Sequence, residues 1–86
     1  MPEISRFYGI VVMLYYADHE PPHFHARYQQ HEAVVRIADG AVLHGRLPDR
    51  AGRLVQEWAA LHRDELTMDW SLARAGQPLL TIPPLP

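Results

Sequence analysis

The sequence predicts an α+β domain, in which an antiparallel sheet of about four strands is followed by one or two C-terminal helices packed on one face of the sheet. Three observations predict this class: strand-like segments fill the first half of the chain, turn residues separate them, and a helix-periodic stretch follows. The 86 residues, 48% of them hydrophobic, suffice for one small core. We therefore expect a single domain with a β meander over 1–47, a helical segment over 48–76 and a proline-rich tail over 77–86.

The first predicted strand covers residues 4–16. It is rich in Ile, Val, Tyr and Phe, and from Ile10 onward apolar residues occupy both parities, as in a central strand that is covered on both faces. In so short a chain, a second copy could supply part of that cover. We therefore expect homodimerisation through this strand as one way of burying Val11, Met13 and Tyr15.

A second strand is predicted over residues 23–29, after a loop over 17–22 in which Pro21 and Pro22 cannot donate to a ladder. Polar and apolar side chains alternate along it, which predicts one outward face and one core face. The outward face carries His23, His25 and Arg27. The core face carries Phe24, Ala26 and Tyr28.

Two further strands, over residues 31–38 and 41–47, are joined by the hairpin signal Asp39-Gly40. Val35, Ile37, Leu43 and Leu47 are expected to point inward. If consecutive strands pair, basic side chains gather on the outward face of the sheet. They are His23, His25, Arg27, Arg36, His44 and Arg46.

Helix signals begin at Pro48 and Asp49, which suit a first turn. Apolar residues then recur at helical spacing as far as a glycine cap at Gly76. A break near Asp64 would give two helices, and one unbroken helix is the alternative. The tail is expected to lie against the body through Leu79, Leu80 and Ile82.

Composition excludes several classes of protein. The chain has no cysteine, so neither a disulfide framework nor a thiolate zinc site is available. Its longest apolar run, residues 10–16, is too short to span a bilayer, and Glu3 and Arg6 interrupt any secretory signal. We therefore expect a cytoplasmic protein without membrane contact. The net charge of −2 argues against a general nucleic-acid coat.

Histidines are concentrated in one short segment, because His19, His23 and His25 are three of only six in the chain. On a strand, alternation directs His23 and His25 to one face while Phe24 anchors the other. Any chemistry is therefore expected here.

Five segments carry a family resemblance: Arg6-Phe7-Tyr8-Gly9-Ile10, Asp18-His19, Pro21-Pro22-His23-Phe24-His25-Ala26, Leu47-Pro48 to Trp58-Ala59, and Leu61-His62-Arg63. Through them the chain resembles a small bacterial family, domain of unknown function 4160 (DUF4160), nearly from end to end. The resemblance implies a fold but no settled activity. It also implies a gene beside that of a second small family, domain of unknown function 2442, in a layout like a toxin–antitoxin pair. A small partner protein encoded by the adjacent gene is therefore expected.

The first functional hypothesis is a transition-metal site. Imidazoles two positions apart on a strand can converge on one ion at about 2.0–2.1 Å. We expect His19, His23 and His25 as ligands, with Asp18, Glu57 or His62 as further candidates. These ligands do not distinguish zinc from nickel or copper, and we expect no other cofactor. Arginines nearby would repel a cation.

The alternative is a toxin–antitoxin-like component that is either a metal-independent ribonuclease or a partner-binding module. In the ribonuclease, His23 and His25 would exchange protons with RNA, and Arg27, with Arg36 and Arg46, would stabilise the developing charge. The binding module would use the sheet to recognise a second copy or a partner protein. A structural interpretation stands beside both: the imidazoles of His23 and His25 simply hydrogen-bond backbone or carboxylate groups.

Overall fold

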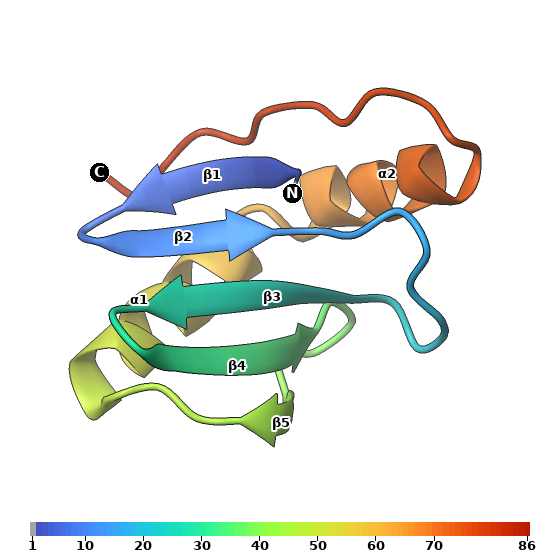
Figure 1. The fold of residues 1–86 in the computed structure, drawn as a ribbon. Coiled ribbons are helices and arrows are strands. Elements are labelled where there is room, and N and C mark those ends of the chain that lie inside the picture. The colour runs from blue at the N-terminus through green and yellow to red at the C-terminus, as the bar shows by residue number, and fades with distance from the viewer. Residues whose placement is uncertain (1) are drawn as a thin grey trace.

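The computed structural model describes residues 2–86, and its strands form one antiparallel sheet in the order β1-β2-β3-β4-β5. The elements in chain order are β1 (Glu3–Phe7), β2 (Ile10–Met13), β3 (His23–Tyr28), β4 (His31–Arg36), β5 (Val42–Gly45), α1 (Asp49–Leu61) and α2 (Arg63–Arg74). Figure 1 shows α1 behind the sheet and the C-terminal tail alongside β1. The α+β class and the antiparallel meander are confirmed.

The prediction of a single first strand over residues 4–16 is wrong, because β1 and β2 are separate strands of a hairpin. Tyr8 and Gly9 form its two-residue turn, with φ of 51° and 79°. Two positive φ values match the right-handed twist of the flanking strands. Hairpin turns of this kind are usually recognised in a sequence by Asn-Gly, Asp-Gly or Gly-Gly. Tyr8-Gly9 has only the glycine, so the sequence gives a weak signal for the turn.

The apolar side chains on the two faces of β2 are buried by different parts of the chain. Ile10 and Val12 face the helices and are fully buried. Met13 lies on the opposite face and is only 1% exposed, and the Tyr15 hydroxyl donates a hydrogen bond to its sulfur at 3.7 Å. The chain itself therefore buries part of the apolar surface of β2 that a second copy was expected to bury. Homodimerisation stays a prediction.

The central strand β3 has the expected faces. Phe24 and Ala26 are fully buried against the helices, and the residues paired with them across β4, Val35 and Ala33, are buried too. His25 pairs with Val34 on the outward face. The alternation along β3 therefore holds as the sequence predicts.

The last strand departs from prediction at its apolar end. The pairing of β5 shifts register between Val34 and Val35, which leaves Leu43 as an extra residue, 39% exposed instead of buried. Such a bulge changes which side chains face inward. Arg46 also leaves the predicted outward face, because it lines a hollow beside Val55 on the helix side.

The helical segment consists of two helices, which was one of the two alternatives predicted from the sequence. His62, with φ of −121°, separates α1 from α2. The end of α2 is followed by Gly76 with φ of 69°, and its backbone N–H donates to the Ala73 carbonyl at 3.1 Å. Among residues 2–86, no helix is long and apolar enough to cross a membrane.

The tail packs along the edge of the sheet through backbone and side-chain contacts. The Ile82 N–H donates to the Ile4 carbonyl at 2.8 Å, and the Trp58 indole donates to the Pro83 carbonyl at 2.9 Å. Ile82 is fully buried and Leu79 is partly buried against the core, but the Leu80 side chain is exposed, contrary to prediction. Leu80 contributes its backbone instead.

Asp69 of α2 holds that backbone. Its Oδ1 accepts a hydrogen bond from the Leu80 N–H at 2.8 Å, while its buried Oδ2 has no partner among the described residues. Burial raises the pKa of the Asp69 carboxyl, and the nearby charge of Glu65 adds to that effect. The tail is therefore fastened to a carboxyl group whose pKa is raised by burial.

We expect this carboxyl to make stability depend on pH. The folded protein holds the Asp69 proton more tightly than the unfolded chain does. The contribution of Asp69 to the free energy of unfolding therefore falls as pH rises from the ordinary carboxyl range through the raised pKa. Asp69→Asn should flatten this fall, measured by thermal unfolding across a pH series. The exposed Glu57→Gln is the control and should follow the wild-type slope. A wild-type slope in Asp69→Asn would contradict the assignment.

Two glycines are expected to respond to alanine with opposite signs. Gly45 has φ of 73°, and an added Cβ would meet the Glu32 carbonyl oxygen, so Gly45→Ala should lower the free energy of unfolding by about 2 kcal/mol or more. Gly52 lies within α1 with no atom within 4 Å of such a Cβ, so Gly52→Ala should raise it by about 0.5–1 kcal/mol. Chemical denaturation measures both, and equal effects would refute the backbone argument.

Candidate functional site

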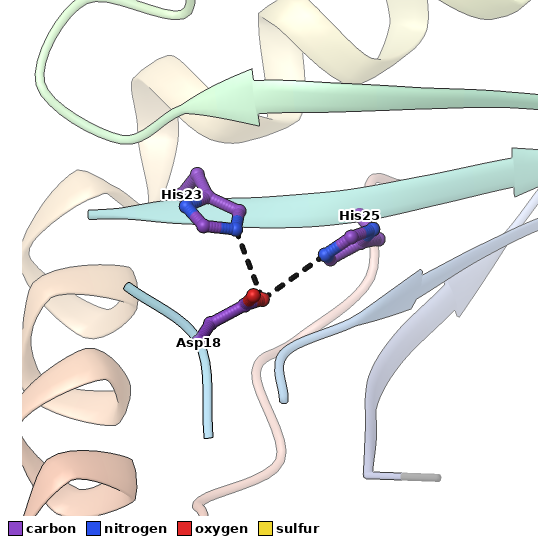
Figure 2. A group of neighbouring side chains, drawn as sticks. All are labelled: Asp18, His23 and His25. Atoms are coloured by element: carbon purple, nitrogen blue, oxygen red, sulfur yellow. Dashed lines mark hydrogen bonds and ion pairs between the residues drawn. The ribbon is translucent and has the colours of Figure 1, made fainter. Parts of the chain in front are cut away.

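The candidate site lies where the loop after β2 meets the start of β3. The sequence alternates at this point, so β3 presents His23 and His25 on the same outward face while Phe24 enters the core. Asp18 comes from the loop. Figure 2 shows both imidazole rings turned toward its carboxylate.

One carboxylate oxygen joins the two histidines. Asp18 Oδ2 lies 2.9 Å from His23 Nε2 and 3.1 Å from His25 Nε2. One ligand atom from each of the three residues lies within 4.8 Å of the others. The group is therefore compact enough to hold a single ion.

The other ring nitrogens contact acceptors as well. His23 Nδ1 lies 2.7 Å from the Pro21 carbonyl oxygen, and His25 Nδ1 lies 3.3 Å from Glu32 Oε2. A carbonyl or an ionised carboxylate only accepts hydrogen bonds, so each Nδ1 has an acceptor to which it can donate. In the neutral tautomer that donates through Nδ1, Nε2 carries a lone pair that faces the Asp18 carboxylate.

A proton or a cation between the two Nε2 atoms and the Asp18 carboxylate satisfies these contacts. A proton on Nε2 of either ring, a proton on Asp18, or one cation shared by Asp18, His23 and His25 fills that position. Two imidazolium rings with centroids only 5.4 Å apart would repel each other. A shared cation satisfies all three acceptors at once.

Aromatic rings restrict water at the two histidines. The Trp70 ring centroid lies 5.3 Å from that of His23, and the Tyr15 ring centroid lies 4.5 Å from that of His25. The side chains of His23, His25 and Asp18 are 8%, 16% and 21% exposed. Asp18 is thus the most accessible of the three, and charges here interact more strongly than they would in open water.

A family model with the description "Domain of unknown function (DUF4160)" matches residues 9–71. The chain belongs to the DUF4160 family. Comparisons with curated proteins and with solved structures give no match. The matched range includes Asp18, His23, His25 and Glu32, whereas the whole of β1 and the whole tail lie outside it.

In this DUF4160 domain, His19 lies outside the three-residue group. It is exposed, and its ring centroid is 6.5 Å from that of His23. Asp18, its neighbour in the chain, takes the position beside the β3 histidines instead. Whether His19 ligates an ion stays a prediction, but the geometry supports Asp18 better.

The helix residues considered as further ligands are also outside the group. His62 Nδ1 lies 2.6 Å from Glu65 Oε1 at the junction of the helices, and the Glu57 side chain is exposed on α1. Neither residue is part of the potential metal-holding group found among residues 2–86. The loop and the sheet alone build the site.

Carboxylates balance the arginines of the DUF4160 sheet. The Arg36 guanidinium donates two hydrogen bonds to Asp39, at 2.9 and 2.7 Å, and this contact holds the pKa of Asp39 well below its usual range. Arg27 Nε lies 3.6 Å from Glu32 Oε1. The outward face is therefore less cationic than the sequence predicts.

Glu32 is the site contact that sequence analysis missed. Because residues 29–30 form a two-residue turn, Tyr28 pairs with His31 and Arg27 pairs with Glu32. Counting outward from that turn would have placed Glu32 diagonally next to His25 on the same face. Trp70 offered no such signal, because its contact with His23 depends on how α2 packs.

Proposed function

We propose that this DUF4160 domain binds a divalent transition-metal ion through Asp18, His23 and His25. One observation carries the proposal: both Nε2 atoms face a single carboxylate oxygen, while both Nδ1 atoms have acceptor partners. A cation coordinated by two imidazole nitrogens and one carboxylate oxygen relieves that arrangement without adding protons.

The donor set suits zinc, nickel or copper. Imidazole nitrogen is a good ligand for all three ions, and a carboxylate completes many zinc sites. Tetrahedral coordination at about 2.0–2.1 Å places ligand atoms about 3.3 Å apart. The Asp18 oxygen lies 2.9 and 3.1 Å from the two nitrogens, so a small outward movement of the loop admits the ion.

The groups behind the ligands also fit metal coordination. A metal-binding imidazole commonly donates its second N–H to a carbonyl or a carboxylate, which fixes the orientation of the ring. The Pro21 carbonyl has this relation to His23, and Glu32 has it to His25. Both rings are thus held with Nε2 available to an ion.

Metal-independent RNA cleavage has less support from the geometry. The two histidines that would exchange protons with RNA share one carboxylate, which ties them to each other. Arg27 and Arg36, which would stabilise the transition state, lie against Glu32 and Asp39. A metal site uses the histidine contacts and leaves these ion pairs undisturbed.

We expect protein purified without a histidine tag to bind about one equivalent of Zn²⁺, Ni²⁺ or Cu²⁺, detected by elemental analysis and by calorimetric titration. His23→Ala, His25→Ala and Asp18→Asn should each weaken binding at least about tenfold, since each removes a ligand or its charge. Thermal unfolding with and without metal reports the same interaction independently, because an ion that binds only the folded state raises the melting temperature.

His19→Ala is the matched control for these variants. It removes the neighbouring exposed imidazole and should leave the dissociation constant within about threefold of wild type, well below the effect of losing a ligand. Loss of metal in His19→Ala with retention in Asp18→Asn would replace the proposed ligand set. A wild-type protein that takes up no metal would overturn the proposal.

A separate prediction concerns the orienting carboxylate. Glu32→Gln should weaken metal binding about tenfold by loosening the hold on His25 Nδ1. Glu32 also contacts Arg27, so Arg27→Gln is the control that removes the ion pair and keeps the contact with His25. Titration calorimetry should show weaker binding only in Glu32→Gln. Equal losses in both variants would assign the effect to the ion pair.

A further inference from the structure

An open hollow of about 600 Å³ adjoins the proposed metal site. Its lining residues are Tyr16, Ala17, Asp18, His19, Glu20 and Arg74. Asp18 belongs both to this lining and to the three-residue group. The hollow therefore borders the site at Asp18, while Trp70 and Tyr15 lie against the imidazoles.

Three protein ligands leave coordination positions unfilled. Structural zinc sites are closed by four protein ligands, whereas sites with two histidines and a carboxylate keep a position for water or another exogenous ligand. Octahedral ions held by such a triad keep more than one. An ion at Asp18, His23 and His25 can thus accept a further donor from the hollow.

Arg74 supplies a fixed positive charge on the wall of that hollow. Its guanidinium lies over the Trp70 ring at 5.9 Å from the centroid, and Nη1 donates to Glu20 Oε2 at 3.0 Å. Trp70 in turn lies against His23. Arg74 therefore packs on the same aromatic ring that lies against the proposed metal site. A guanidinium has five N–H donors, and the hydrogen bond to Glu20 uses only one of its nitrogens.

Building on the proposed metal site, we propose that the bound ion and Arg74 together bind an oxyanion in this hollow, by way of a phosphate or carboxylate group. One anion oxygen coordinates the ion, and another accepts hydrogen bonds from the guanidinium. Arginine pairs with both kinds of oxyanion through parallel N–H donors. The ligand is thus recognised at two points, one on the sheet and one at the end of α2.

Charge supports an anionic occupant over a cationic one once the ion is present. The divalent ion and Arg74 outweigh the carboxylates of Asp18 and Glu20 in the lining by one positive charge. Without the ion, Arg74, Asp18 and Glu20 carry one net negative charge and favour a cation. Anion binding should therefore depend on metal.

The test uses Co²⁺, whose visible absorption reports its coordination, with inorganic phosphate and acetate as probes. Phosphate or acetate should change the spectrum of the cobalt-loaded wild-type protein in a saturable way. Arg74→Gln should raise the anion dissociation constant about tenfold or more and leave that for cobalt unchanged, because it removes a charge-assisted donor and no metal ligand. Arg74→Lys, which retains the charge, should lose less.

Two further variants separate the proposed contact from general effects. Glu20→Gln removes the carboxylate that competes for Arg74 and should tighten anion binding about threefold. Arg53→Gln removes an exposed arginine of α1 that does not line the hollow and should change nothing. Weaker binding in Glu20→Gln, or equal losses in Arg53→Gln and Arg74→Gln, would overturn the role of Arg74.

The outcomes distinguish this inference from the proposed function. A protein that binds none of Zn²⁺, Ni²⁺, Cu²⁺ and Co²⁺ overturns both. A protein that binds cobalt but shows no spectral response to either anion overturns only the oxyanion site. A response to phosphate stronger than that to acetate assigns a phosphate group, and the reverse assigns a carboxylate, both in support of the site.

Discussion

The alternation of side chains along β3 is the constraint on which the site depends. Phe24 and Ala26 are fully buried in the core cluster to which both helices also contribute. A strand that buries these residues necessarily turns His23 and His25 outward together. The position of the site is therefore held by the free energy of burying the core, and a one-residue slip of β3 would destroy both.

The preceding loop completes what β3 begins. The Asp18 carboxylate contacts both imidazole rings of β3, the strand that follows the loop, and the Pro21 carbonyl orients the ring of His23. The loop thus supplies a ligand and an orienting group, while the rigid sheet supplies the two imidazoles. Trp70 connects this arrangement to α2, so that a hollow with a cationic wall forms beside the proposed ion.

Sequence reasoning succeeded where a single local pattern decided the outcome. Alternation predicted β3 and its faces, and the glycine cap at Gly76 predicted where the helical segment ends. It failed where a turn or a bulge interrupted a pattern that looked continuous. The turn at Tyr8-Gly9 splits one expected strand into two, and the bulge at Leu43 exposes a side chain expected in the core.

The sequence by itself determined the family, the α+β class and the shared face of His23 and His25, because these follow from side-chain periodicity and local motifs. Only the tertiary structure decided that Asp18, and not His19, stands between the imidazoles. Adjacent residues in a loop differ in direction according to the backbone path, and periodicity says nothing of that path. The contacts of Trp70 and Arg74 likewise depend on the docking of α2, which brings together residues about fifty positions apart.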